Sequence, residues 1–381
     1  MTTVDELWVL LRKSVTMRDS VRASLAEADG RVLREPVMSP QDQPAFDRSA
    51  VDGFVVLSSD DSPSFRVVDE IRAGQWKQRK LGRGEAMKIA TGAAVPCEGC
   101  EVVMLEDAVE DGAAVRLKQR GRGNIRLRGE DASTGDILVA VGRKISAGVA
   151  GLLATAGCTS PLVTRRLSVL HVATGGEIVP PEAEPEAGQI RDANSAMVGA
   201  WARPRGLQLT QARVSEDMPA LLRAIEGERD LLLVSGGSSV GGHDNTAKAL
   251  AEAGFEILVS QVAVRPGRPV IVGRRGDSWA FGLPGNPLSH FVCLHLFVAA
   301  AVAAMEGGSP RPRVRNRIVA AAVAGNPRET WWPAIAESRM IRPLRWRSSG
   351  DLTSLARADA LLRVPPSGIA AGDEAEFIRA L

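Results

Sequence analysis

The chain contains no tyrosine, and aromatic residues make up only 4% of its 381 residues. Proteins that bind single-stranded nucleic acid stack the bases on exposed aromatic rings, so this composition disfavours that class. Lysine and arginine together number 47 and aspartate and glutamate 45, which leaves a net charge of +2 and no global basic field. We therefore expect no nucleic-acid partner.

Cysteine is scarce and long hydrophobic runs are absent. The four cysteines, Cys97, Cys100, Cys158 and Cys293, are too few for a disulfide scaffold and are typical of a reducing compartment. The first residues hold no apolar segment of signal-peptide length. The most apolar segment, residues 291–305, is shorter than the ~20 residues that span a bilayer. We expect a cytoplasmic protein with no membrane partner, in which residues 291–305 form a buried helix.

Hydrophobic spacing divides the chain into several blocks, as its length requires. The spacing of apolar residues predicts helix over 5–33 and again over 145–157. Between them, short β-rich runs alternate with Gly, Asp and Ser turns, which predicts a small inserted β domain. The tail, 313–381, is predicted to form another small β domain.

Residues 167–305 alternate between strand and helix patterns. We predict strands at 167–172, 231–234, 270–272 and 279–283, and helices at 195–201, 218–225, 246–253 and 288–305. Such alternation is typical of a parallel, doubly wound α/β domain.

One loop of this domain is rich in glycine. In LLLVSGGSSVGGHDNTAKAL (231–250) an apolar strand runs into a turn that contains Gly236, Gly237, Ser238 and Gly241. Glycines let the backbone approach a ligand, and a helix N-terminus offers free N–H groups, so the loop suits a phosphate. Glycine-rich turns also occur in α/β proteins without any ligand there. Asp244 is either the N-cap of the helix predicted from Thr246 or a metal ligand beside a bound phosphate.

Two further loops and one basic turn also contain candidate ligand-binding residues. The segment 170–180 contains Thr174 and Glu177, and the segment 279–292 contains Ser289. Because loops at the carboxyl ends of strands gather over one crevice, we expect Asp244, Glu177 and Ser289 to face one ligand. In VRPGRP (264–269), two arginines on a rigid turn either bind an oxyanion or form a solvated turn.

The order of several motifs along nearly the whole chain adds a resemblance. PAFDRSAVDGF (44–54), IATGAAVP (89–96) and NIRLRGED (124–131) are followed by ATGGEI, GQIRDANS (188–195), SGGSSVGGHD, RPGRP and GLPGNPLS. The tail segments SSGDLTSLARADALLRVPP and AGDEAEF complete the series. Together they resemble the molybdopterin molybdenumtransferase family, to which the gephyrin E domain is related.

The resemblance implies an elongated α/β multidomain fold. It implies an N-terminal domain in two segments (1–43 and 143–166) and an inserted β-rich lid domain (44–142). A doubly wound molybdopterin-binding α/β domain (167–308) and a C-terminal β-barrel domain (309–381) follow. The family forms homodimers, with the active cleft between the α/β domain of one chain and the N-terminal parts of the other.

The resemblance also implies a reaction. Molybdate is inserted into adenylylated molybdopterin with Mg²⁺, which releases AMP and forms molybdenum cofactor. Possible partners are the protein that adenylylates molybdopterin in the preceding step and the molybdoenzymes that receive the finished cofactor. The catalytic residues carried over are Asp52, Asp131, Glu177 and Asp244, with Glu177 and Asp244 also as metal ligands. The substrate-binding residues carried over are Thr91, Thr174, Gly236, Gly237, Ser238, Gly241, Arg265, Arg268, Pro284, Gly285, Asn286 and Ser289.

Departures from the family pattern keep a second hypothesis open. Arg265 and Arg268 replace lysines, and Gly176 replaces an aspartate. A carrier of molybdopterin or finished cofactor, or a scaffold of the gephyrin kind, is therefore the alternative, although the retained acids favour the enzyme. Molybdate and tungstate, both tetrahedral dianions, are not distinguished. The Cys97–Cys100 pair is half of a zinc site at best. A metal or redox role is the alternative for it, and ordinary thiols are the favoured interpretation.

Overall fold

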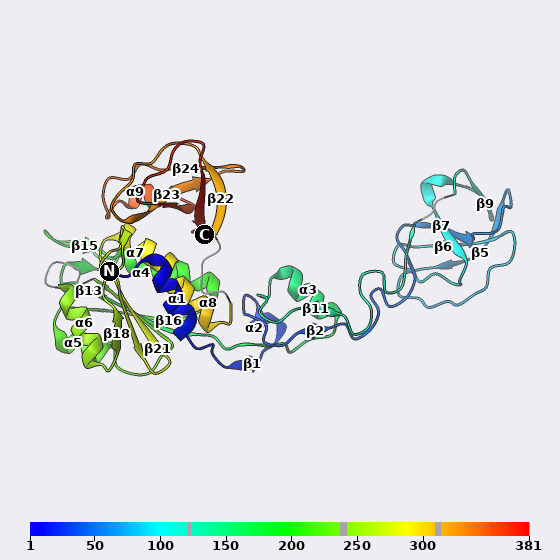
Figure 1. Cartoon of the computed structure of the whole chain (residues 1–381). Helices are drawn as coiled ribbons and strands as arrows, with labels where there is room; N and C mark the ends of the chain where they lie inside the picture. Colours follow the sequence, from blue (N-terminus) through cyan, green and yellow to red (C-terminus); the bar gives the residue numbers. More distant parts are fainter. Residues whose placement is uncertain (121–122, 237–241, 309–313, 381) are drawn as a thin grey trace. The chain divides into compact units, whose positions relative to one another are not determined.

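The computed structural model describes residues 1–120, 123–236, 242–308 and 314–380, and for residues 242–244 and 314–315 it describes the backbone alone. The chain forms two compact units (Figure 1). Unit 1 comprises Met1–Arg34, Gly142–Ser146 and Pro161–Leu381, and unit 2 comprises Glu35–Val141 and Ala147–Ser160.

A six-stranded sheet is the centre of unit 1. Its strands, in spatial order, are β16 (Gln208–Val214), β13 (Ser168–Thr174), β17 (Leu231–Gly236), β21 (Ser278–Leu283), β20 (Ile271–Arg275) and β18 (Glu256–Val259). The first four run parallel. The prediction of a wholly parallel sheet is wrong at the other edge, where β20 and β18 are antiparallel. Only Gly276 and Asp277 separate β20 from β21, and so short a connection forces a hairpin.

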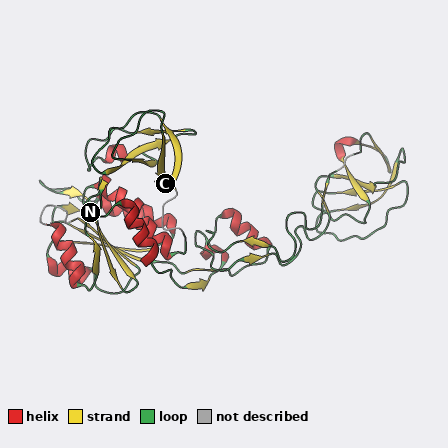
Figure 2. Cartoon of the chain, viewed as in Figure 1, coloured by secondary structure: helices red, strands yellow, loops and turns green. Residues whose placement is uncertain are grey.

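The central strands are apolar on both faces, as a sheet covered on both sides requires. Along β17, Leu231 and Leu233 point into one core, and Leu232 and Val234 point into another. The helices α5 (Met218–Ala224) and α6 (Gly242–Glu252) contribute to the second core. The first core is built with α1 (Val4–Ser14), α4 (Ala193–Ala202) and the helix that follows β21. Helices therefore cover both faces of the sheet (Figure 2), and the predicted doubly wound α/β domain is confirmed.

The helix after β21 runs from Pro287 to Met305 as α7 (Pro287–Cys293), a π-helical segment η3 (Leu294–Val298) and α8 (Ala299–Met305). Of the helices that the structure describes, it is the one long and apolar enough to span a membrane. Most of its side chains lie in the first core, and the Trp8 indole donates a hydrogen bond to the Leu296 carbonyl at 2.9 Å. The prediction of a buried helix is confirmed.

The N-terminal segment is not one helix. The helix α1 ends at Ser14, and β1 (Ser20–Arg22) then pairs with β12 (Leu162–Thr164) before the short helix α2 (Leu25–Ala28). The helix prediction for 5–33 is therefore wrong beyond Ser14, except at the short helix α2. The periodicity there was loose, and pairing with a strand far along the chain decides the local structure.

A closed barrel forms the C-terminal part of unit 1. Its strands, in order around the barrel, are β23 (Glu329–Ala336), β24 (Met340–Pro343), β22 (Val314–Val319), β26 (Glu374–Arg379) and β25 (Ala360–Val364). The barrel closes because β25 also pairs with β23. The short strand β19 (Val264–Arg265) joins the edge of β23, and the helix α9 (Leu352–Leu355) precedes β25. The predicted C-terminal β-barrel is confirmed.

Unit 2 is built on a second six-stranded sheet, as the β-rich pattern predicts. Its strands, in spatial order, are β7 (Cys100–Met104), β4 (Gly53–Leu57), β6 (Glu85–Ile89), β5 (Phe65–Ile71), β9 (Ala114–Leu117) and β8 (Ala108–Asp111). The unit also contains two short strand pairs: β2 (Val37–Met38) with β11 (Ile137–Val139), and β3 (Arg48–Ser49) with β10 (Ile125–Arg126). The 3-10 turn η1 (Leu105–Asp107) and the helix α3 (Ala147–Thr155) complete the unit.

Candidate functional site

A cavity of about 480 Å³ lies at the carboxyl ends of the parallel strands of unit 1. Its lining comes from the loop after β13 with the strands β14 (Ile178–Val179) and β15 (Ile190–Arg191), the start of α4, the loop after β16, the end of β17 and the turn before α7. This edge of a doubly wound sheet is where such domains bind ligands. Of the predicted site residues, Glu177, Gly236, Gly285 and Asn286 line the cavity.

The N-terminus of α4 forms one wall of the cavity. Asp192 is the N-cap, since its carboxylate accepts hydrogen bonds from the Ser195 amide at 2.9 Å and hydroxyl at 2.6 Å. Arg213 donates to the same carboxylate. Burial raises the pKa of Asp192, but the hydrogen bonds from Ser195 and Arg213 outweigh burial and lower the pKa overall. The cap is therefore ionised and fixes the end of the helix at the cavity.

Asn194 links the two helix starts. Its Nδ2 donates to the Gly285 carbonyl at 2.8 Å, which ties α4 to the turn before α7. Its Oδ1 is buried and has no hydrogen-bond partner among the described residues. An unpaired acceptor in the wall of a cavity is costly unless a ligand or water supplies a donor. Asn194 is thus a candidate ligand contact that the sequence analysis missed.

Gly236 closes the strand β17 in a conformation that only glycine adopts readily. Its φ is +108°, and a Cβ built on it would lie 1.9 Å from the carbonyl oxygen of Thr174. The backbones of β13 and β17 approach each other closely here, and Thr174 is buried between them. Close packing of this kind brings the glycine backbone to the surface of the cavity.

The rest of the predicted anion loop is only partly described. Gly237, Ser238 and Gly241 lie outside the described residues. The helix α6 begins at Gly242, so Asp244 belongs to its first turn and is not its N-cap, contrary to one of the two interpretations. The side chain of Asp244 lies outside the described part of the chain.

A chain of three buried polar side chains runs directly under the cavity. The Ser235 hydroxyl lies 2.7 Å from His171 Nε2 and 2.7 Å from His290 Nε2. Burial lowers the pKa of His171 to about 4 and that of His290 to about 3, so both rings are neutral at physiological pH. Ser235 precedes Gly236, and His290 lies in the first turn of α7. These hydrogen bonds therefore connect the end of β17 to the start of α7, on two sides of the cavity. The sequence analysis missed it, because each residue alone is an ordinary polar residue.

The predicted basic turn lies beside the barrel. Arg265 belongs to β19, which pairs with β23, and its guanidinium stacks over Trp346 at 5.3 Å. Arg268 donates to the Gln261 side chain at 3.0 and 3.1 Å. Arg328, just before β23, completes a cluster of three: burial, and then Arg268 and Arg265, lower its pKa. Three guanidiniums that repel one another form a surface suited to an oxyanion.

Two other predicted residues lie near the cavity, and one residue of the arginine cluster was not predicted. Pro284 and Ser289 are buried in the turn and the first turn of α7, next to the lining residues Gly285 and Asn286. Arg328 was missed because it lies some sixty positions from Arg265, and strand pairing alone brings them together.

Two of the three predicted residues of unit 2 contact each other. The Thr91 amide donates to Asp52 Oδ1 at 2.7 Å, and the Ser49 amide donates to the Ala93 carbonyl at 2.9 Å. The pairing of β3 with β10 brings the segment that carries Asp131 to the same place. Asp131 itself accepts from Arg126 at 2.5 Å and stays half exposed. Thr91 and Asp52 are thus joined directly, and Asp131 is held by Arg126 of β10, the strand that pairs with β3.

Gly53 explains why Asp52 stands where it does. A Cβ on Gly53 would lie 1.9 Å from the Val103 carbonyl oxygen, so the strand β4 can begin there only with glycine. Its neighbour Asp52 is consequently held at the exposed start of the strand.

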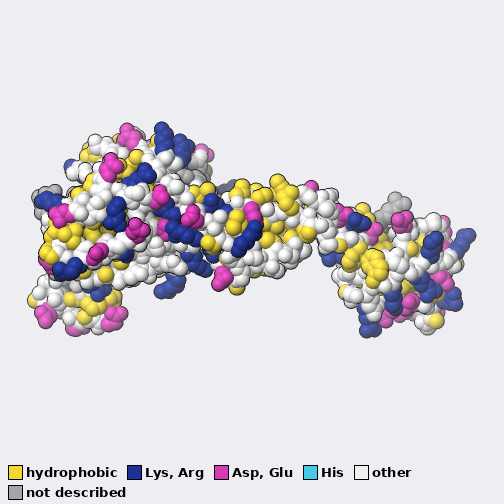
Figure 3. Space-filling view, turned by 90° about the horizontal axis from the view of Figure 1, so that it is seen from below, with side chains coloured by type: hydrophobic (Ala, Val, Ile, Leu, Met, Phe, Trp, Pro, Cys, Tyr) yellow, Lys and Arg dark blue, Asp and Glu magenta, His cyan; other side chains and the backbone are white. Residues whose placement is uncertain are grey.

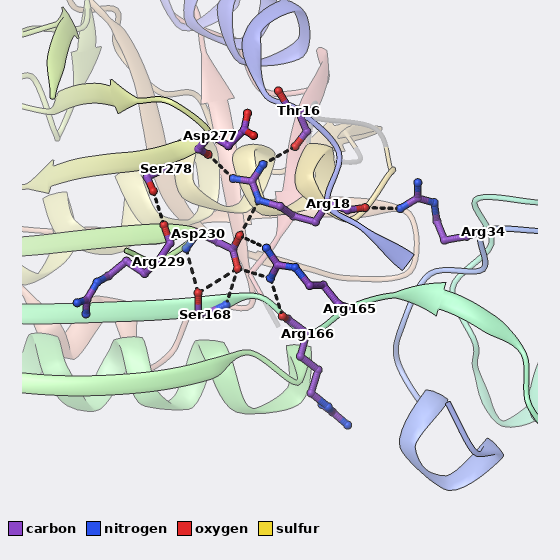
Figure 4. Close-up of polar contacts among 10 residues, drawn as sticks. All are labelled: Thr16, Arg18, Arg34, Arg165, Arg166, Ser168, Arg229, Asp230, Asp277 and Ser278. Carbon is purple, nitrogen blue, oxygen red and sulfur yellow. Dashed lines mark hydrogen bonds and ion pairs between the residues drawn. The ribbon is translucent and has the colours of Figure 1, made fainter. Parts of the chain in front are cut away.

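A larger cavity, of about 640 Å³, lies at the opposite, amino ends of the strands. It surrounds Asp230, which accepts from Arg18 at 2.6 Å, from Arg165 through two bonds of 2.6 Å, and from Ser168 (Figure 4). Figure 4 shows Arg18 and Arg165 pointing toward this one carboxylate. Asp230 is ion-paired to Arg18 and Arg165, and the cavity lies away from the carboxyl ends of the strands, so we do not assign the active site to it.

Charge and carboxylate placement agree with an anionic ligand held together with a cation. On the face drawn in Figure 3, basic and acidic side chains are intermixed, so selectivity must come from local clusters. Glu177 and Glu216 are exposed carboxylates on the rim of the 480 Å³ cavity. Carboxylate oxygens are the donors that Mg²⁺ prefers, so the acids present fit that ion. No group of three metal-ligating side chains is found among the residues the structure describes, which leave out the Asp244 side chain.

Comparisons with known proteins agree along the chain. Residues 2–157 match the family model "MoeA N-terminal region (domain I and II)", residues 171–304 "Probable molybdopterin binding domain" and residues 317–379 "MoeA C-terminal region (domain IV)". A curated protein from Staphylococcus epidermidis named molybdopterin molybdenumtransferase is 30% identical over 399 residues, covering 97% of this chain and 93% of that protein. One of the same name from Staphylococcus aureus is 30% identical over 388 residues, covering 94% and 91%.

Solved structures agree as well. The molybdopterin biosynthesis moeA protein from Pyrococcus horikoshii has a TM-score of 0.77 at 26% identity, with 100% of this chain and 99% of that chain covered. A second structure of the protein from the same species, strain OT3, has a TM-score of 0.82 at 24% identity, with 99% of each chain covered. The second likeness, at this identity, concerns the fold alone.

Proposed function

Because the chain belongs to the molybdopterin molybdenumtransferase family, we propose that it inserts molybdate into adenylylated molybdopterin, releasing AMP and forming molybdenum cofactor. The observation that carries this proposal is the 480 Å³ cavity, where two helix starts, a glycine strand end and the Glu177 carboxylate meet. The family membership favours this transferase over the carrier.

The cavity walls suit the phosphate groups of the substrate. The start of α4 lies in the cavity wall, and the dipole of this helix favours an anion there. Gly236 lets the strand backbone approach that anion, and Asn194 Oδ1 accepts from a donor on the ligand. These groups bind and orient the substrate without carrying a net positive charge.

A divalent cation, which we propose is Mg²⁺, complements them. Glu177 and Asp244 would hold it, with Glu216 on the same rim. When bound, Mg²⁺ neutralises negative charge on a phosphoanhydride as it is cleaved. The Glu177 side chain, exposed at the mouth of the cavity, is free to meet it.

The oxyanion binds, in this proposal, at the arginine cluster. Arg265 and Arg268 offer charge-assisted hydrogen bonds to molybdate, and Arg328 adds a third guanidinium from the barrel. The mutual repulsion of the three is relieved when a dianion binds among them.

The test measures AMP release from adenylylated molybdopterin, with Mg²⁺ and molybdate present or omitted. We expect release to require both, and to fall at least about a hundredfold in Glu177→Gln and Asp244→Asn. Glu182→Gln, an exposed acid that does not line the cavity, is the matched control and should keep full activity. Binding of the pterin without AMP release in the unmodified protein would contradict the transferase and favour a carrier.

We further propose that the enzyme is a cytoplasmic homodimer in which Asp52 and Asp131 of one chain complete the cavity of the other. Each site then needs Glu177 from one protomer and Asp52 from its partner. Glu177→Gln and Asp52→Asn are each expected to be inactive, whereas heterodimers from equal mixtures regain about a quarter of the activity, because half the dimers hold one intact site. Mixtures that stay inactive although heterodimers form would rule this arrangement out.

A further inference from the structure

Two cysteines of unit 2 lie close enough to react with each other. Cys97 is in the turn before β7, Cys100 is the first residue of β7, and their sulfur atoms are 3.1 Å apart. That is about 1 Å longer than a disulfide bond. Both side chains are half-buried against the hydrophobic core of the unit. A small shift of the turn therefore suffices to join them.

A metal site is the weaker interpretation of this pair. Thiolates bind zinc in sets of four ligands, and this motif supplies two. No group of three His, Cys, Asp or Glu side chains able to hold a metal occurs in the described parts of the chain. Thiol–disulfide chemistry needs only the two sulfur atoms that are present.

A groove gives one of the two thiols access to small molecules. Its volume is about 470 Å³, and Cys97 lines it whereas Cys100 does not. Arg79 and Lys80, both exposed, line the groove together with the exposed acid Glu98, so two positive charges face one negative charge, and the buried Pro96 precedes Cys97. The Arg79 guanidinium approaches Glu85 only to 3.9 Å, so most of its hydrogen-bonding capacity is left for a ligand. The groove therefore suits a small disulfide that carries carboxylates.

We propose that Cys97 and Cys100 form a reversible disulfide by exchange with an anionic low-molecular-weight disulfide, of the class of oxidised glutathione, bound in this groove. The Cys97 thiolate attacks one sulfur of the bound molecule, its S–S bond breaks, and the first small thiolate leaves. The Cys100 sulfur, having lost its proton, attacks Cys97 in the mixed disulfide, and the second small thiolate leaves. The two thiolates take up the two protons, so two protein thiols are oxidised and one small disulfide is reduced to two thiols.

The order of the two attacks follows from the surroundings of the sulfur atoms. Burial and the hydrogen bond with Cys97 raise the pKa of Cys100, which disfavours its thiolate. Cys97 is the sulfur that meets solvent in the groove. Cys97 therefore attacks first and Cys100 resolves the mixed disulfide.

The disulfide would act on a segment that already carries site residues. The loop 90–96, which ends beside Cys97, bonds to the segment 47–52 through Gly92, Ala93 and Val95. Its Thr91 amide holds the Asp52 carboxylate. A cross-link at Cys97 restrains the end of this loop. The oxidation itself concerns unit 2 alone and does not rest on the proposed transferase reaction.

The experiment exposes the purified full-length chain to oxidised glutathione and analyses its tryptic peptides by mass spectrometry. Lys88 and Arg116 bound a single peptide, 89–116, that contains Cys97 and Cys100 and no other cysteine. We expect this peptide to lose two hydrogen atoms, the free thiols to fall from four to two, and excess dithiothreitol to restore them. Retention of all four thiols, or a reaction that stops at the mixed disulfide, overturns the proposal.

Two sets of variants test the assignment within it. Cys100→Ser should keep one glutathione on residue 97, whereas Cys97→Ser should leave the peptide unmodified; modification of Cys100 at the original rate in Cys97→Ser overturns the order of attack. Arg79→Gln with Lys80→Gln should slow oxidation by glutathione disulfide about threefold to tenfold and leave oxidation by neutral bis(2-hydroxyethyl) disulfide unchanged. Equal effects on both reagents would overturn the role of the groove.

Discussion

The strongest prediction for stability concerns Asp230. We expect Asp230→Asn to remove a carboxylate that faces both Arg18 and Arg165, and to leave the buried Arg18 and the partly exposed Arg165 without this partner. Asp230 and Arg18 are each only 5% exposed. Removing one member of such a buried cluster costs about 3 to 5 kcal/mol.

The pKa of Asp230 gives a second estimate of its contribution to the free energy of unfolding. Burial raises the pKa of Asp230, yet hydrogen bonds from Arg165, Ser168 and Arg18 hold it at about 2, below the ordinary 3.8. A lowered carboxyl pKa stabilises the fold above pH 3.8, and this contribution is lost as the pH falls through about 2. The difference amounts to about 2 kcal/mol. Because the asparagine also leaves the arginines unpaired, we take about 3 kcal/mol as the expected loss at neutral pH.

The assay is thermal unfolding followed by tryptophan fluorescence. Six of the seven tryptophans belong to unit 1, so the signal reports the unit that contains Asp230. A loss of about 3 kcal/mol lowers Tm by about 6 to 10 °C for a unit of this size. Asp277→Asn is the matched control: this exposed acid lines the same cavity, and its backbone carbonyl, which the change preserves, is what Arg18 contacts. If the two variants unfold at the same temperature, our account of the cluster is refuted.

Three further predictions use other parts of unit 1. Between pH 7 and pH 5 the free energy of unfolding should fall by about 2 kcal/mol for each histidine that burial keeps neutral in the folded state, because the same histidines of the unfolded chain take up protons in this pH range. Urea unfolding at pH 7 and at pH 5 measures the difference. These histidines are His171, His290 and His295. Arg328→Gln should raise the molybdate concentration for half-maximal AMP release about tenfold, and the exposed Arg339→Gln should not. Gly236→Ala should lower the free energy of unfolding by at least about 2 kcal/mol, because the added Cβ meets a carbonyl oxygen. Gly151→Ala, in open space on α3, is the control and should not lower it. Urea titration measures both free energies.

Local patterns predicted what depends on local sequence. The strands β13, β17 and β21 were predicted because continuous apolar runs that alternate with helical periodicity are typical of a covered parallel sheet. The edge strands β16 and β18 were not, because one side of an edge strand is exposed and its polar residues hide the pattern. The antiparallel turn at Gly276 could have been recognised from its Gly–Asp pair.

The site residues also divide into those that local sequence patterns predicted and those that they did not. Glycine positions and the acid Glu177 stand in recognisable loops, and the structure places Glu177, Gly236, Gly285 and Asn286 around one cavity. Arg328 and the His171–Ser235–His290 chain became visible only through contacts between distant segments. The periodicity and spacing of residues in a sequence do not reveal the contacts that strand pairing or helix packing creates between distant segments. The assignment of catalytic roles stays a prediction that AMP release will test.

The contact between Trp8 and Leu296 also bears on how the chain folds as it is made. The helix α1 shares the first core with the buried helix that ends at Met305, and Trp8 packs edge-on against Trp331. A ribosome synthesises the first helix long before either partner exists, so its apolar face stays uncovered for most of translation. Closing a loop of nearly 300 residues is slow compared with forming the inserted β unit, which needs only its own strands. Unit 2 should therefore fold first, and the apolar face of α1 stays uncovered until the helix that ends at Met305 and the strand that carries Trp331 have been synthesised.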